Sequence, residues 1–163
     1  MNRWLGVLVA MSFSLLSACA PLVTQSPGEG LSPVNAVSED GDKHLMLFGH
    51  DVVSYFTEGT HKMGSPAIKS VYKGVTFRFS KPENKALFDA TPGKYIPQFG
   101  GYCAYGVSHG ARAPIKIEAW QIVNGRLLMQ YDLGVKDDFN KDQQSTLKKA
   151  DQNWPGLVDK YGK

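Results

Sequence analysis

The chain has 163 residues, of which 42% are hydrophobic and 20% charged, and its net charge is +3 at pH 7. This is the length of a single domain, long enough to bury a core without disulfide bonds. The lysines are spread along the chain, with no basic block and no stripe of alternating aromatic and basic residues, so the composition argues against nucleic-acid binding.

Residues 1–18 have the pattern of an export signal. Arg3 gives a basic start, and the apolar run over residues 4–16 is shorter than the roughly 20 residues that a membrane-spanning helix needs. A short apolar run followed by small residues is typical of a signal peptide that is later removed. The sequence Leu16-Ser17-Ala18-Cys19 resembles a bacterial lipobox, which implies cleavage before Cys19 and lipidation of that residue. Ala20 in the next position implies anchoring to the outer membrane, facing the periplasm. An ordinary signal peptide with a chance cysteine is the alternative.

Residues 19–43 are predicted to be the lipidated cysteine and a flexible tether, because prolines and glycines break any helix there. The folded domain is then expected to span residues 44–163. Its sequence shows no internal repeat.

A short helical turn capped by Asp51 is the first element expected in the domain. Residues 68–80 predict a β-hairpin, because apolar and polar residues alternate after a turn at Tyr72-Lys73-Gly74. The sequence Ser80-Lys81-Pro82-Glu83 has the pattern of a capping box, which predicts a helix that runs to about Ala90.

Residues 120–131 predict a second hairpin, since Asn124-Gly125 is a strong type I′ turn signal between two apolar runs. The last long helix is expected to begin at Asp137 and to end at Lys149, with a break at Asn153-Trp154-Pro155 before a short terminal helix. This order favours an α+β fold: a single small domain with two antiparallel β-hairpins and two to four helices, after a signal peptide and a tether.

The glycine-rich stretch over residues 99–110 carries the candidate site, because it holds Cys103 and, six residues later, His109. If Cys19 is lipidated, Cys103 is unpaired in a compartment that favours disulfides. A thiolate and an imidazole are ligands that copper and zinc prefer. A third ligand is expected from the remaining histidines, and His50 is selected because it lies beside Asp51. Thioethers that could serve copper are present at Met46, Met63 and Met129, while the other two histidines are His44 and His61.

Two other interpretations of Cys103 remain open. In one the protein is a small thiol-dependent enzyme, in which Cys103 is a nucleophile, His109 or His50 is its base, and Asp51 orients that base. In the other, Cys103 is a buried small hydrophobe and the domain is a ligand-free interaction module of the cell envelope. Candidate residues for lining a pocket are Asp51, Tyr55, Tyr102 and Tyr105.

Several segments between residues 45 and 160 resemble the YHS-domain family in its exported bacterial branch. The residues that carry the resemblance are Gly49-His50-Asp51-Val52-Val53-Ser54-Tyr55-Phe56, Tyr72-Lys73-Gly74-Val75-Thr76-Phe77-Arg78-Phe79-Ser80, Glu83-Asn84-Lys85-Ala86-Leu87-Phe88, Pro92-Gly93-Lys94-Tyr95, Gly100-Gly101-Tyr102-Cys103-Ala104, Ala119-Trp120 and Gly125-Arg126-Leu127.

This resemblance implies a small α+β domain and metal binding, with copper and other soft or borderline ions foremost. Ser80 and Asn84 stand where metal-binding relatives carry cysteines, so the metal site of those relatives is not carried over. The sequence therefore predicts an exported lipoprotein, held at the membrane by its lipid anchor, whose YHS-like domain binds copper, zinc or another transition metal. The expected ligands are Cys103, His109 and His50.

Overall fold

The computed structural model describes residues 33–162 of the chain. The predicted signal peptide, the lipidation site Cys19 and the first part of the predicted tether lie outside these residues. Among the described helices, none is both long enough and apolar enough to cross a membrane.

The elements of the first half of the described chain are β1 (Ala36–Glu39), β2 (Asp42–Met46), η2 (Leu47–Gly49), α1 (Ser54–Thr57), β3 (Ser65–Tyr72), β4 (Val75–Phe79), α2 (Pro82–Ala90) and α3 (Pro92–Tyr95). Those of the second half are η3 (Phe99–Gly101), α4 (Ala104–Ser108), β5 (Trp120–Val123), β6 (Arg126–Met129), α5 (Leu133–Lys141) and α6 (Gln143–Tyr161).

The strands form two sheets, one of four strands in the order β1-β2-β4-β3 and one of two strands, β5-β6. Hairpins β3–β4 and β5–β6 are antiparallel, whereas β2 joins β4 in parallel. This confirms the prediction of a single α+β domain, and both predicted hairpins are present, while β1–β2 forms a third antiparallel hairpin. Three helices of one turn (α1, α3 and α4) bring the α-helices of the described chain to six, more than the two to four expected.

The predicted boundary between tether and domain at residue 43 is wrong. Strand β1 lies inside the predicted tether, and it pairs with β2 from Ala36 opposite Met46 to Glu39 opposite Asp42. Proline and glycine composition indicated a tether here, but the backbone of residues 36–39 finds hydrogen-bond partners in the neighbouring strand, which composition does not reveal.

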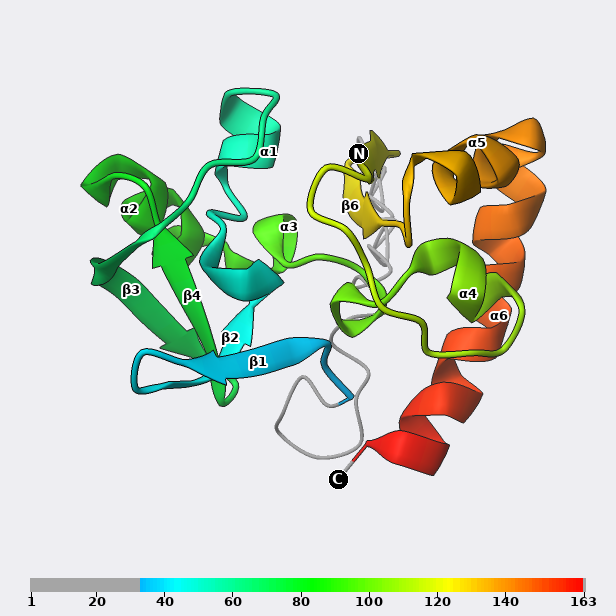
Figure 1. Ribbon diagram of the computed structural model, residues 1–163, viewed down its shortest axis with the longest axis horizontal. Helices are drawn as coiled ribbons and strands as arrows, with labels where there is room; N and C mark the ends of the chain where they lie inside the picture. Colours follow the sequence, from blue (N-terminus) through cyan, green and yellow to red (C-terminus); the bar gives the residue numbers. More distant parts are fainter. Residues whose placement is uncertain (1–32, 163) are drawn as a thin grey trace, which may run out of the picture.

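The domain consists of two units that repeat the same order of elements, although the sequence itself shows no internal repeat. Each unit runs from a left-handed turn through a one-turn helix and a β-hairpin to a nine-residue helix, α2 in the first unit and α5 in the second. Strand and helix have the same spacing in both units, since β4 and α2 begin at residues 75 and 82, and β6 and α5 at residues 126 and 133. In Figure 1 the first unit, with α1, β3, β4 and α2, lies on the left, and the second, with α4, β6 and α5, lies on the right.

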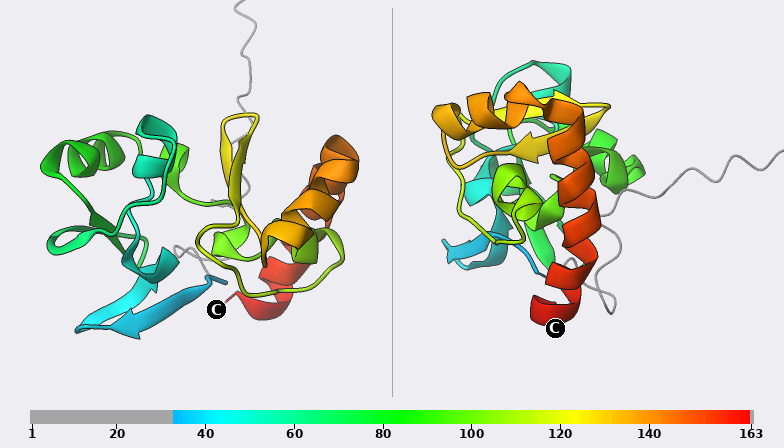
Figure 2. Two further views of the ribbon diagram at one scale, coloured as in Figure 1. Left: turned by 45° about the horizontal axis from the view of Figure 1, so that its top comes forward. Right: turned by 90° about the vertical axis from the view of Figure 1, so that its right-hand side faces the viewer.

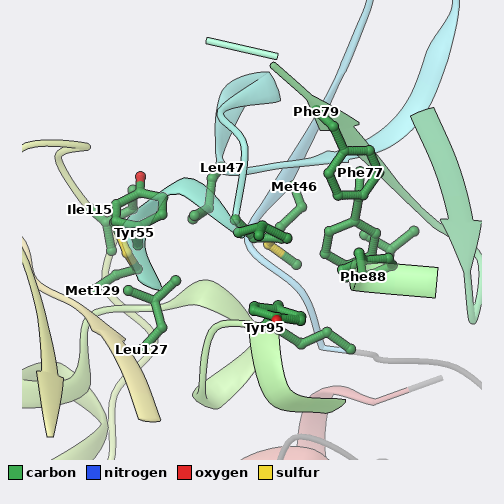
Figure 3. Close-up of a cluster of buried hydrophobic side chains, with 14 of the residues drawn as sticks. Met46, Leu47, Tyr55, Phe77, Phe79, Phe88, Tyr95, Ile115, Leu127 and Met129 are labelled. Atoms are coloured by element: carbon green, nitrogen blue, oxygen red, sulfur yellow. The ribbon is translucent and has the colours of Figure 1, made fainter. Parts of the chain in front are cut away.

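The two units pack on a shared apolar core, and the C-terminal helix packs against the second unit. The core cluster contains Phe77, Phe79 and Phe88 from the first unit and Leu127 and Met129 from the second. Figure 3 shows the three phenylalanines grouped on one side and Leu127 and Met129 on the other, with Tyr95 between them. Helix α6 runs along the outer side of the second unit (Figure 2) and buries Trp154, Leu157 and Val158 in a second cluster.

The last long helix, expected from Asp137 to Lys149, is divided at Asp142 into α5 and α6. Two further predictions of helix ends are wrong for identifiable reasons. Ser80 does not cap α2: the cap position is Lys81, which makes no side-chain cap hydrogen bond, and the Ser80 hydroxyl donates to Asp51 instead. The predicted break at Asn153-Trp154-Pro155 is absent, because α6 continues through Pro155. Burial of Trp154 and Leu157 on one face of this helix outweighs the loss of one backbone hydrogen bond at the proline.

Candidate functional site

Cys103 is the N-cap residue immediately before α4, with its side chain inside the protein and 1% exposed. Its thiol donates to Oε1 of the buried Gln130 at 3.4 Å, and its sulfur accepts the backbone N–H of Gly106 at the same distance. Burial raises the pKa of the Cys103 thiol, and the backbone N–H groups of Gly106, Tyr131 and Tyr105 offset only part of that effect. The sulfur is therefore a protonated, covered thiol at neutral pH, and the geometry does not support a ready nucleophile.

His109 lies at the opposite end of the same short helix and is exposed. Its Nδ1 donates to the carbonyl of Tyr105 at 2.9 Å, and its ring packs on the ring of Tyr105. His50 belongs to the other unit. Within residues 33–162 no group of three or more histidine, cysteine, aspartate or glutamate side chains is placed to hold a metal ion, so the structure does not bring Cys103, His109 and His50 together as one site.

Asp51 is fully buried and serves as a hydrogen-bond acceptor rather than as a partner of a catalytic base. Its carboxylate accepts the backbone N–H groups of Val53 at 2.9 Å and Ser80 at 2.8 Å. The Ser80 hydroxyl and the Asn84 amide donate to it as well, each at 2.7 Å. Ser80 and Asn84 thus both hold the Asp51 carboxylate, which ties α1, β4 and α2 together.

The three tyrosines expected to line a pocket are distributed over the two units. Tyr55 is buried on α1 and meets the ring of Trp120 edge to face, with centroids 5.0 Å apart, and burial raises the pKa of its hydroxyl. Tyr102 is half-buried and donates its hydroxyl to the Val34 carbonyl at 3.1 Å, and Tyr105 is half-buried beside His109.

The structure places one other group of metal-ligating side chains side by side: His50, His61 and Met63, which we call the His–Met cluster. His50 and Met63 are opposite each other in an antiparallel bridge, which is flanked by the hydrogen bonds Asp51 N–H to Lys62 O and Gly64 N–H to Gly49 O. This is the non-hydrogen-bonded kind of pair, in which the two side chains are closest. His61 precedes Met63 by two residues, and its ring lies beside that of His50.

Imidazole geometry in the His–Met cluster suits a shared ion. The ring centroids of His50 and His61 are 5.6 Å apart. A ring nitrogen lies about 2 Å from a bound first-row metal, and the ring centre lies about 1 Å beyond it, so two imidazoles on one ion have centroids roughly 5–6 Å apart.

His50 is oriented in the manner of a metal ligand. Its Nδ1 donates to the Leu47 carbonyl at 3.0 Å, which leaves Nε2 as the nitrogen with a free lone pair. Metal-binding histidines usually donate their other ring N–H to such an acceptor. Burial lowers the pKa of the His50 imidazole, and the neighbouring His61 acts in the same direction. A neutral ring is the form that binds a metal.

Lys62 of segment 61–63 and Lys81 share the carboxylate of Glu58, so these three charged side chains sum to +1. Lys62, between His61 and Met63, pairs with Glu58, and Lys81 pairs with the same carboxylate at 3.0 Å. These two lysines hold the pKa of Glu58 down to about 2, so its negative charge is present throughout the neutral range.

Sequence reasoning named each member of the His–Met cluster but missed the grouping. The available signal was His61-Lys62-Met63, in which two potential ligands alternate with a charged residue, as on one face of an extended segment. The pairing of this segment with Gly49-His50-Asp51 is a tertiary contact, and nothing local in the sequence indicates it.

Comparison of the chain with protein-family models, with curated proteins and with solved structures found no match.

Proposed function

We propose that this protein is an exported lipoprotein, anchored to the bacterial outer membrane and facing the periplasm, whose YHS-like domain binds a transition metal ion. Copper is the first candidate and zinc the second. The cellular address rests on the signal-like sequence and on the lipobox-like Leu16-Ser17-Ala18-Cys19. The metal-binding part rests on a single observation, the pair of imidazole rings of His50 and His61 with centroids 5.6 Å apart.

The ligands proposed here differ from those expected from the sequence alone. Cys103 is covered and its thiol pKa is raised, and His109 lies at the far end of α4. His50 keeps its predicted role but gains His61 as its partner. Imidazole nitrogens suit both copper and zinc, so this pair does not by itself choose between the two metals.

The test is metal titration of the full chain, purified in detergent without a histidine tag. Equilibrium dialysis against Cu(II) or Zn(II) should give one bound ion per chain. His61→Ala removes an exposed ring and should abolish stoichiometric binding while thermal unfolding of the metal-free protein stays unchanged. His50→Ala should have the same effect on binding.

Two matched controls are available in the chain. His44 and His109 are exposed, and each directs its Nδ1 to a backbone carbonyl as His50 does, but neither has a second histidine ring beside it. His44→Ala and His109→Ala should bind as the wild type does. The proposal would be contradicted if the wild type binds no ion. It would also be contradicted if the two control variants lose binding while His61→Ala keeps it.

A further inference from the structure

We propose that Met63 is the third ligand of the His–Met cluster and makes the site selective for Cu(I) over Zn(II). This inference rests on the proposed metal-binding function, and it adds which oxidation state and which metal the site prefers. No other sulfur ligand enters the argument, because Cys103 lies in the second unit with its sulfur covered.

Position is the first argument. Met63 is the direct cross-strand neighbour of His50, in the kind of pair whose side chains approach most closely, and the ring of His50 lies beside that of His61. The three residues therefore lie on two adjacent stretches of backbone, residues 49–51 and 61–64. The backbone hydrogen bonds at 2.8 and 2.9 Å that join these stretches hold Met63 opposite His50.

Exposure is the second argument. The Met63 side chain is 60% exposed, whereas Met46 and Met129 are buried in the core. Methionine is an apolar residue that usually fills gaps in a core, so packing does not account for this position. The long flexible side chain is exposed to solvent opposite His50, where its thioether is free to bind.

The choice of metal follows from the donor set. A thioether is a soft ligand and selects Cu(I), whereas zinc in proteins takes thiolate, imidazole and carboxylate ligands. No aspartate or glutamate of residues 33–162 joins the two histidines in a group of three, so the charged oxygen ligand that would favour a harder divalent ion is missing from this part of the chain. Two imidazoles and a thioether thus favour Cu(I).

The test compares Met63→Leu with the wild-type full chain in detergent. Cu(I) affinity is measured anaerobically by competition with a colorimetric Cu(I) chelator, and Zn(II) affinity by equilibrium dialysis. Met63→Leu keeps the size and apolarity of the exposed side chain, so the fold should hold, which thermal unfolding of the metal-free protein checks. Cu(I) affinity should fall by about tenfold or more, a loss that even the removal of a supporting group causes at metal sites, while Zn(II) affinity stays the same.

X-ray absorption at the copper edge provides an independent readout. The Cu(I)-loaded wild type should show one sulfur neighbour, which is absent in Met63→Leu and retained in Cys103→Ser. If Met63→Leu leaves Cu(I) binding and the sulfur signal unchanged while His61→Ala still abolishes binding, the Met63 assignment is overturned and the proposed function stands. If the wild type binds neither Cu(I), Cu(II) nor Zn(II), both fail.

Discussion

At the residue scale, Asp51 and Cys103 occupy equivalent positions in the two units, but their side chains serve different purposes. Each residue follows the left-handed turn of its unit by two positions and precedes the one-turn helix. Asp51 accepts the backbone N–H of Ser80, just after β4, and Cys103 lies near the backbone N–H of Tyr131, just after β6. In each unit this side chain lies between the one-turn helix and the end of the second hairpin strand. It is a hydrogen-bonded carboxylate in the first unit and a covered thiol in the second, so both residues have a structural explanation.

The Cys103 thiol should react with a thiol reagent only after the protein unfolds. It is 1% exposed and burial raises its pKa, so both access to the sulfur and its thiolate fraction are low. The rate of reaction with an aromatic disulfide reagent at pH 8 should be negligible in the native protein and should rise to that of a free thiol in guanidinium chloride. Cys103→Ser supplies the background. Rapid reaction in the native state would instead support the thiol-dependent enzyme.

At the scale of elements, the left-handed turns η2 and η3 are the most demanding pieces of the fold. Residues 47–49 and 99–101 all have positive φ, between 48° and 84°, and three of the six are not glycine. Side chains pay a steric penalty in this conformation, so the surrounding packing must hold it. Leu47 and Phe99 are buried at these positions, and their burial supplies that stabilisation.

Gly100→Ala should destabilise the protein by about 2 kcal/mol or more, since a left-handed alanine costs roughly 1–2 kcal/mol and a steric clash adds to it. The new Cβ would lie 2.1 Å from the Pro33 carbonyl oxygen, at φ +60°, where the backbone of residues 33–35 crosses the turn. Gly93→Ala is the matched control, because a Cβ there meets no atom within 4 Å and the residue lies inside α3. Chemical denaturation measures both. Equal midpoints for the two variants would contradict this account.

What could be predicted from the sequence at this scale follows the range of the interactions. The turns at Lys73-Gly74 and Asn124-Gly125 were predictable, because a glycine between two runs of strand-forming residues is a local signal of a hairpin turn. All four residues have positive φ in the structure. The role of Ser80 was not, since its choice between capping α2 and binding Asp51 depends on a residue 29 positions away. The same limit hid the His–Met cluster, which depends on the pairing of residues 49–51 with 62–64.

At the scale of the whole molecule, the repeat of two units could not be recognised in the sequence, because few equivalent positions of the two units carry the same residue. Gly74 and Gly125 end the two hairpin turns, and Phe88 and Phe139 are buried at the same position of α2 and α5. Most other equivalent positions differ, since the first unit packs against the added strands β1 and β2 and the second against α6. Different neighbours require different side chains even where the backbone follows the same path.

The stability of the whole domain should fall in acid partly through Asp42, which links three strands of the larger sheet. This buried carboxylate on β2 accepts from Lys69 on β3 at 2.6 Å and from Arg78 on β4 at 2.8 Å. Hydrogen bonds from Lys69 first, and then from Arg78, hold the pKa of Asp42 below its usual 3.8. A carboxyl whose folded pKa is depressed contributes stability above the unfolded pKa, and that contribution is lost as the pH falls through the folded pKa.

Denaturant unfolding of wild type and Asp42→Asn from pH 7 to pH 2 measures this contribution. At pH 7 the variant should be less stable, because Lys69 and the buried Arg78 lose their charged partner. Below about pH 4 the difference in unfolding free energy should shrink, since a protonated Asp42 resembles asparagine. Asp138→Asn, which removes an exposed pair with Lys141, should track the wild type at every pH. A difference between wild type and Asp42→Asn that stays constant across the range would show that the carboxyl keeps the same protonation in the folded and unfolded chain, and that the ion pairs across β2, β3 and β4 do not depress its pKa.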